Sequence, residues 1–186
     1  MKRKDVISIT GDLASGQSTV AKMLAEDLSF NLYRNGAYFR NLAVKNNMSV
    51  TEFGEYVEKH PEIDMQIEKS AAEYALNNKN IVIDAKMGWY AVPDSFKIYL
   101  KVNIDVAAKR AFKDPNRKKS ENLPTIEDQK NDMIKRAKND LARYNNLYNV
   151  DRSDMSNYDF VLNTDNLTPE EVLQIVKQEY EKWKQN

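Results

Sequence analysis

The apolar residues of this chain follow two patterns, short and largely apolar runs and longer stretches with a period near 3.6 residues. Short apolar runs are typical of strands buried in a parallel sheet, whereas the longer period indicates amphipathic helices. Because runs and periodic stretches alternate, the pattern predicts an α/β fold. The runs lie at 6–10, 30–33, 81–84, 96–102 and 158–163.

Helix signals separate these runs. Ser49-Val50-Thr51-Glu52 has the composition of a capping box, and Thr168-Pro169 is a helix start. No repeat or low-complexity stretch divides the chain, so we expect one domain over residues 1–186. The predicted helices lie at about 19–28, 36–44, 52–57, 61–76, 104–112, 126–148 and 169–183.

The first run leads into a loop that contains two glycines, Gly11-Asp12-Leu13-Ala14-Ser15-Gly16-Gln17-Ser18-Thr19. A strand, a G-x-x-x-x-G-K-[S/T] loop and a helix form a P-loop, whose backbone N–H groups bind a di- or triphosphate. Ser18 stands where the hydroxyl that binds magnesium belongs, and Thr19 can reach a further phosphate. Gln17 replaces the usual lysine, and its amide can donate a hydrogen bond but carries no charge. The ordinary alternative is a strand-to-helix turn without a ligand.

The apolar run Ile81-Val82-Ile83 ends in the carboxylate of Asp84. Ligands of doubly wound sheets bind at the carboxyl ends of the strands. Beside a P-loop, Asp84 is therefore a candidate acid for the magnesium shell, although a lone aspartate at a strand end is as often a turn or cap residue. We expect a loop after it, in which Trp89 and Tyr90 either wall a base site or pack in the core.

Cations gather in two later segments. A basic run at 109–119 precedes Leu123-Pro124 and has the composition of a lid that closes over phosphates, although such runs are usually solvated faces. In the next helix Arg136, Asp140 and Arg143 recur at i, i+4 and i+7. They form either a surface ion-pair ladder or an anion site.

Composition excludes several classes of function. Lys plus Arg and Asp plus Glu number 28 each among 186 residues, so no net field recruits nucleic acid or a membrane. The absence of cysteine excludes disulfides and thiol nucleophiles, and the single histidine, His60, argues against a serine-type triad. No apolar run approaches the ~20 residues that span a bilayer. The first strand leaves no room for a signal peptide. We expect a cytoplasmic monomer or weak dimer that binds no nucleic acid polymer.

Over nearly its whole length the chain resembles the cytidylate kinase-like family of nucleoside monophosphate kinases, especially the archaeal-type branch. The most particular stretches are His60-Pro61-Glu62-Ile63-Asp64 and Tyr158-Asp159-Phe160-Val161-Leu162-Asn163-Thr164, and Gly36-Ala37-Tyr38-Phe39-Arg40 is similar to the branch's G-x-x-F-R. The resemblance implies a doubly wound five-stranded parallel sheet with an acceptor-binding insertion at about 35–78 and a lid at about 113–124. It also implies transfer of the γ-phosphoryl group of ATP to CMP or dCMP, with Mg²⁺.

The resemblance further implies roles for matching residues. Ser18 and Asp84 would hold magnesium, and the P-loop together with Arg110 would bind ATP. The residues implied to bind the acceptor nucleotide are Gly36, Arg40, Lys86, Asp140 and Arg143. The residues implied to be catalytic are Arg136, Arg143, Arg117, Lys86 and Gln17.

Three residues depart from the family pattern. Gln17 replaces the P-loop lysine, Lys86 stands where arginine is usual, and Ala137 stands where many relatives carry an acid. We expect a lid cation, or Lys86, to replace the missing charge. One alternative is a nucleotide-binding protein with weak or lost kinase activity, and another is a kinase for a small metabolite such as a shikimate-like acid. The lid cations concerned are Arg117, Lys118 and Lys119.

Overall fold

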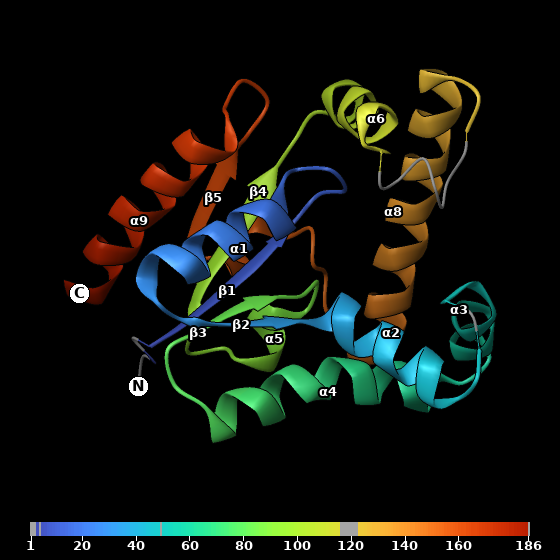
Figure 1. The fold of residues 1–186 in the computed structure, drawn as a ribbon, viewed down its shortest axis with the longest axis horizontal. Coiled ribbons are helices and arrows are strands. Elements are labelled where there is room, and N and C mark those ends of the chain that lie inside the picture. The colour runs from blue at the N-terminus through green and yellow to red at the C-terminus, as the bar shows by residue number, and fades with distance from the viewer. Residues whose placement is uncertain (1–2, 4, 49, 116–122, 186) are drawn as a thin grey trace.

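The structure, a computed structural model, describes residues 3, 5–48, 50–115 and 123–185. Its centre is one five-stranded, all-parallel sheet, as the family resemblance implied, and the strand order is β2-β3-β1-β4-β5 (Figure 1). β1 pairs with β3 on one side and with β4 on the other, and β2 and β5 form the two edges of the sheet. This is the doubly wound arrangement. The strands are β1 Val6–Gly11, β2 Asn31–Arg34, β3 Ile81–Asp84, β4 Phe96–Lys101 and β5 Phe160–Asn163.

Helices cover both faces of the sheet. Figure 1 shows α1 and α9 together on one side, with α4 and α5 on the other. Beyond the carboxyl ends of the strands stands α8, which packs against α6. The described helices are α1 Gln17–Leu28, α2 Asn35–Lys45, α3 Val50–Glu58, α4 Pro61–Asn77, α5 Gly88–Ala91, α6 Ile104–Lys113, α8 Ile126–Tyr148 and α9 Pro169–Gln185, with a 3₁₀ turn at Met155–Asn157.

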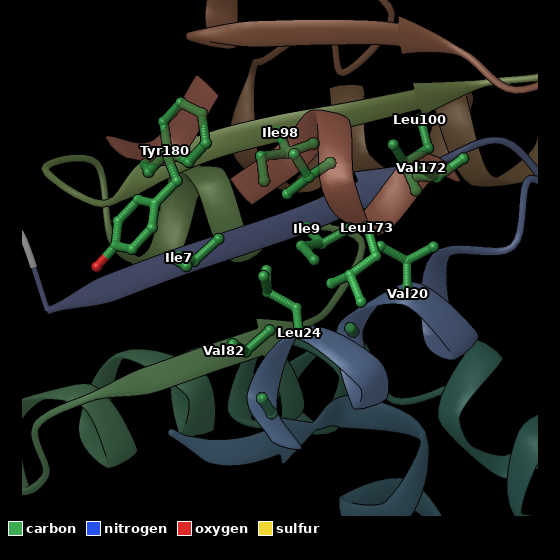
Figure 2. Packing of buried hydrophobic residues seen from close by; sticks show 14 residues of the cluster. Ile7, Ile9, Val20, Leu24, Val82, Ile98, Leu100, Val172, Leu173 and Tyr180 are labelled. Carbon is green, nitrogen blue, oxygen red and sulfur yellow. The ribbon is translucent and has the colours of Figure 1, made fainter. Parts of the chain in front are cut away.

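The sheet alternates its side chains between two cores. Ile7 and Ile9 of β1 point toward α1 and α9, where Leu24 and Leu173 meet them (Figure 2). Val6 belongs instead to the cluster on the opposite face, under α4. This period of two is expected of a strand, and a strand buried on both faces is therefore apolar at nearly every position.

The segment that contains α2, α3 and α4 has a small cluster of its own. Phe53, Val57 and Ile67 are buried there together with Ala43. The same segment also joins the sheet, because Ala71 and neighbouring residues of α4 pack on β3. Ser49, the first residue of the predicted capping box, lies outside the described residues.

Two predicted elements differ from the structure. The expected loop after Asp84 contains a short helix, α5, because Gly88 lets the chain pass close to Ile83, where a Cβ would lie 3.1 Å from Ile83 Cγ2. Trp89 of this helix is buried against Tyr158, with ring centroids 5.5 Å apart, so it is a core residue. The last strand begins at Phe160 rather than at Tyr158, which follows the 3₁₀ turn.

In the described part of the chain, no helix is long and apolar enough to cross a membrane.

Candidate active site

A cavity of about 780 Å³ opens at the carboxyl ends of the strands. It is bounded by the P-loop, by the ends of β2 and β3, and by side chains of α2, α4, α6 and α8. Predicted site residues from distant parts of the sequence therefore meet around one space. Those that line it are Gly11, Asp12, Leu13, Ala14, Gly16, Gln17, Ser18, Thr19, Gly36, Arg40, Asp84, Lys86, Arg110, Arg136 and Arg143.

The P-loop has the tight path that its two glycines predict. A Cβ on Gly11 would lie 2.6 Å from Ser15 Oγ and 2.7 Å from the Leu100 carbonyl oxygen, so only glycine fits there. Gly16 has a φ of 90°, in the left-handed region, and α1 begins at the next residue. The first N–H groups of α1 have no acceptor within the helix, so this end can bind an anion.

Two P-loop side chains serve the loop itself. The Asp12 carboxylate accepts hydrogen bonds from the Tyr99 hydroxyl at 2.6 Å and the Val102 N–H at 3.0 Å, which ties the loop to β4. Ser15 is buried, and its hydroxyl has no hydrogen-bond partner among the described residues. The contacts of the Asp12 side chain therefore stabilise the path of the P-loop.

Gln17 is turned toward the sheet. Its Nε2 donates to the Ile9 carbonyl at 2.9 Å and to Asp84 Oδ1 at 2.8 Å. Because both partners only accept hydrogen bonds, the orientation of the amide is unambiguous, and its two hydrogens are both used. In this conformation both amide hydrogens of Gln17 are used within the protein, and its role in binding ATP stays a prediction.

Asp84 has a second partner that sequence reasoning missed. Its Oδ2 pairs with Nε of Arg34 at 3.2 Å, and the Asp84 side chain is only 8% exposed. The register of the sheet explains the meeting, since Arg34 is opposite Asp84 and Asp84 is opposite Ile9. The signal in the sequence was Arg34 itself, a charged residue directly after the short apolar run at 30–33.

The Arg/Asp/Arg helix, α8, joins a partly buried network of charges. Asp140 accepts a hydrogen bond from Lys86 and lies 3.4 Å from Arg143 Nη2. Arg143 Nε also lies 3.4 Å from Asp64 of α4, whose side chain is 8% exposed. Asp140 and Arg143 thus belong to a charge network in the site and not to an isolated surface ladder.

The two outer arginines of this region are more exposed. The side chain of Arg136 is 42% exposed and lies 3.6 Å from Asp132, one turn earlier in α8. Arg40 is exposed at the cavity and makes no ion pair within the described part of the chain.

Two buried carboxylates of α4, Asp64 and Glu68, also line the cavity, and sequence reasoning assigned them no role. Glu68 accepts hydrogen bonds from Asn35 at 2.8 Å and from the Tyr144 hydroxyl at 3.1 Å. Burial raises the pKa of Glu68 to about 7. Burial also raises the pKa of Asp64, against the opposing effect of Arg143. The signal for them was the spacing of Asp64 and Glu68, one turn apart on a predicted helix.

Burial, opposed by Asp140, lowers the pKa of Lys86, so the cation depends on that carboxylate partner.

Arg110 lines the cavity from α6. It donates to the Thr164 carbonyl at 2.5 Å and to Thr164 Oγ1 at 3.2 Å, which fixes it to the end of β5. Thr164 Oγ1 in turn donates to the Ser15 carbonyl at 3.1 Å, so Arg110 is held beside the P-loop. The predicted lid at about 113–124 falls mainly outside the described residues, as do Arg117, Lys118 and Lys119.

The fit to magnesium can be judged from donor chemistry. Among the described residues no three His, Asp or Glu side chains gather into an all-protein metal site. Magnesium usually keeps several waters and takes one or two protein ligands in addition to substrate phosphates. The exposed Ser18 hydroxyl and the Asp84 carboxylate line the same cavity, which fits that mode.

Comparison of the fold with solved structures finds kinases of small molecules. Shikimate kinase from Bacteroides thetaiotaomicron aligns with a TM-score of 0.68 at 15% identity, covering 95% of this chain and 98% of that one. Shikimate kinase from Aquifex aeolicus aligns with a TM-score of 0.58 at 16% identity, covering 95% and 96%. At such identities the likeness shows the fold alone.

Sequence comparison is more specific. Cytidylate kinase of Sulfurisphaera tokodaii is 34% identical over 177 residues, which cover 92% of this chain and 93% of that protein. Cytidylate kinase of Pyrococcus horikoshii is 35% identical over 177 residues, covering 95% and 88%. The model of the cytidylate kinase-like family matches residues 6–166, from β1 past the end of β5. The chain therefore belongs to the cytidylate kinase-like family.

Proposed function

We propose that this protein transfers the γ-phosphoryl group of ATP to a cytidine monophosphate, CMP or dCMP. One observation carries the proposal: a P-loop and a cluster of cationic side chains line the same cavity of about 780 Å³. Two nucleotides can therefore place their phosphates end to end between them. The cytidylate kinases among the relatives support the choice of base.

On the donor side, the P-loop backbone and the start of α1 bind the phosphates of ATP. Ser18 and Asp84 would hold a magnesium ion, which would neutralise charge on the phosphates of ATP. Arg110, fixed by Thr164, lies at the adenine end of this site.

On the acceptor side, Arg40, Arg136 and Arg143 bind the phosphate of the monophosphate, beside Gly36. Guanidinium groups suit this task because they donate paired hydrogen bonds to phosphate oxygens. Lys86 and Asp140 act as a pair, in which Asp140 keeps the half-buried ammonium charged and positioned. With its carboxylate, Asp140 also contacts the acceptor nucleotide.

The chemistry needs positioning and positive charge more than acid–base catalysis. A phosphate oxygen of CMP attacks the γ-phosphorus, the bond to the bridging oxygen breaks, and ADP leaves as CDP forms. Lys86, Arg136 and Arg143 stabilise the charge that spreads over the equatorial oxygens in the transition state. We propose that the segment at 113–124, with Arg117, closes over the phosphates and excludes water.

The test is ADP formation by the purified protein with CMP, dCMP, UMP, AMP and shikimate as separate acceptors. We expect the highest kcat/KM with CMP or dCMP. Turnover with shikimate alone would replace the proposal with a metabolite kinase. If the protein bound ATP but turned over no acceptor, it would be a nucleotide-binding protein without kinase activity. The hydrogen bonds of Gln17 to Ile9 and Asp84 favour this alternative, because they leave no amide hydrogen for a phosphate.

A further inference from the structure

The P-loop lacks the positive charge that its sequence pattern normally carries. Gln17 is neutral, and its two amide hydrogens are occupied by Ile9 and Asp84. A triphosphate in this loop therefore meets backbone N–H groups but no side-chain cation from position 17.

Lys86 cannot supply this missing charge without losing its own contacts on the proposed acceptor side. Its ammonium group is hydrogen-bonded to Asp140, which also pairs with Arg143. Those two residues belong to α8, and Lys86 and Asp140 together line a smaller pocket beside Gly11 and Asp12 of the P-loop. Moving Lys86 to the donor phosphates would leave Asp140, whose side chain is 16% exposed, without its closest cation.

Arg34 is placed differently. It ends β2, and its Nε donates to the same Asp84 carboxylate that accepts from Gln17. The terminal Nη atoms of Arg34 have no hydrogen-bond partner within the described part of the chain, and the side chain is 39% exposed and lines the cavity. Arg34 is thus a cation that is held at one nitrogen and open to a ligand at the other two.

We propose that Arg34 supplies the charge that the P-loop lacks, by contacting the terminal phosphate of ATP from the end of β2 as a catalytic residue. The inference rests on the proposed phosphoryl transfer and assigns a residue that this function had not used.

Charge balance supports this assignment. In a P-loop with lysine, the lysine supplies one positive charge beside the strand-end carboxylate. Here the carboxylate of Asp84 meets neutral Gln17 and cationic Arg34, so the sum of charges is the same while the cation comes from another strand. A guanidinium held at Nε can offer both Nη atoms to one phosphate, as a paired contact.

The rival explanation is that Arg34 only holds Asp84 in place. Arg34→Gln separates the two roles, because a glutamine amide can still donate to Asp84 but carries no charge. The double variant with Gln17→Lys exchanges the charge between the two positions. As a control, Lys177→Ala removes an ion pair of similar exposure, to Asp27 at 2.6 Å, which lies away from the cavity.

We expect Arg34→Gln to lower kcat with CMP by about 10²-fold, the usual loss for one transition-state contact, with the KM for CMP within about threefold. Gln17→Lys in the Arg34→Gln background should restore at least about tenfold of kcat by returning the charge. Lys177→Ala should keep the activity of the unmodified protein. A kcat for Arg34→Gln within about threefold of the unmodified protein, or no recovery in the double variant, would overturn the proposal.

A binding measurement decides the question even without turnover. By calorimetry, Arg34→Gln should bind a non-hydrolysable ATP analogue about tenfold more weakly while its affinity for AMP is unchanged, since only the triphosphate reaches the guanidinium. Equal affinity of both proteins for the analogue would overturn the role of Arg34. Absence of turnover by the unmodified protein with every acceptor would instead overturn the proposed kinase function.

Discussion

At the scale of single residues, the cations that line the cavity are of two kinds: some form ion pairs with acids of the protein, and others do not. Arg143 and Lys86 are paired with the buried or half-buried acids Asp64 and Asp140, so their removal disturbs the protein as well as a ligand. Arg40 makes no ion pair within the described ranges, and it lines the same cavity. Function and stability can therefore be separated most cleanly at Arg40.

Arg40→Ala should raise the KM for CMP by about 10- to 100-fold, the equivalent of one charged hydrogen bond to phosphate. The unfolding free energy should change by no more than about 0.5 kcal/mol, because the side chain removed is exposed and has no ion pair with any described residue. Steady-state kinetics and denaturant unfolding measure the two effects. An unaltered KM would remove Arg40 from the acceptor site.

Arg143→Ala provides the contrast to this variant. It should weaken CMP binding and also destabilise the fold by about 1–3 kcal/mol, since buried Asp64 loses its cation.

Glu68 predicts a pH dependence of stability. Its pKa in the folded protein is about 7, raised by burial from an ordinary 4.5, so the folded state binds the proton more tightly than the unfolded chain. The stabilisation from this proton is fully present below pH 4.5 and is lost as the pH rises to about 7. Its size is on the order of 3 kcal/mol, because the pKa rises from 4.5 to about 7.

Glu68→Gln should remove this slope, because the amide cannot titrate and still accepts from the Tyr144 hydroxyl. Unfolding free energies between pH 5 and pH 7.5 in both proteins test it. Parallel curves for the two proteins would show that Glu68 keeps its ordinary pKa. Asp64, Arg143 and Lys86 face Glu68, and they are present in both proteins.

At the scale of elements, the turn from β1 into α1 is fixed by close backbone contact. The carbonyl of Leu100 on β4 approaches Gly11 so closely that a Cβ would lie 2.7 Å away. Arg152, which is buried, donates to the Gly11 carbonyl at 3.2 Å. The loop is therefore held from both sides before any nucleotide binds.

Gly11→Ala should destabilise the protein by about 1–3 kcal/mol, as overpacking in a close-packed interior does, and should weaken ATP binding because the loop must shift. Gly54→Ala in α3 is the matched control. Nothing lies within 4 Å of a Cβ at that glycine, so alanine should stabilise the helix by up to about 1 kcal/mol. Thermal unfolding of both variants measures the difference, and equal Tm values would contradict the argument.

At the scale of the whole molecule, the core is divided. The main clusters lie on the two faces of the sheet, whereas Phe53, Val57 and Ile67 form a smaller cluster among α2, α3 and α4. Phe53 packs against Phe39, with ring centroids 5.0 Å apart, and Phe39 lines the cavity beside Arg40. The smaller cluster thus supports the part of the cavity that we propose to bind the acceptor nucleotide.

Phe53→Ala should therefore weaken CMP binding more than ATP binding. Truncation of this buried phenylalanine should lower the unfolding free energy by about 3–5 kcal/mol, and the destabilisation should be concentrated in α2 to α4. Hydrogen exchange should increase in that segment while the protection of β1 and β4 stays near its original value. Equal loss of affinity for both nucleotides, or exchange at the global rate everywhere, would show that the segment does not open separately.

What the sequence determined by itself was the local part of the structure. The strand runs, the helix starts and the P-loop follow from periodicity, capping residues and the two glycines, which act over a few neighbouring residues. Every predicted strand is present, and the boundaries shift where tertiary contacts intervene, as at Tyr158 and Gly88. The family could also be read from the chain, because its motifs are contiguous.

What only the tertiary structure decided was which side chains pair. The register of three strands sets Arg34, Asp84 and Ile9 in one row, and this explains both the partners of Gln17 and the missed role of Arg34. Asp64 and Glu68 likewise gain their character from burial against α8. Register and burial depend on residues far apart in the chain, so neither a motif nor a period could reveal them.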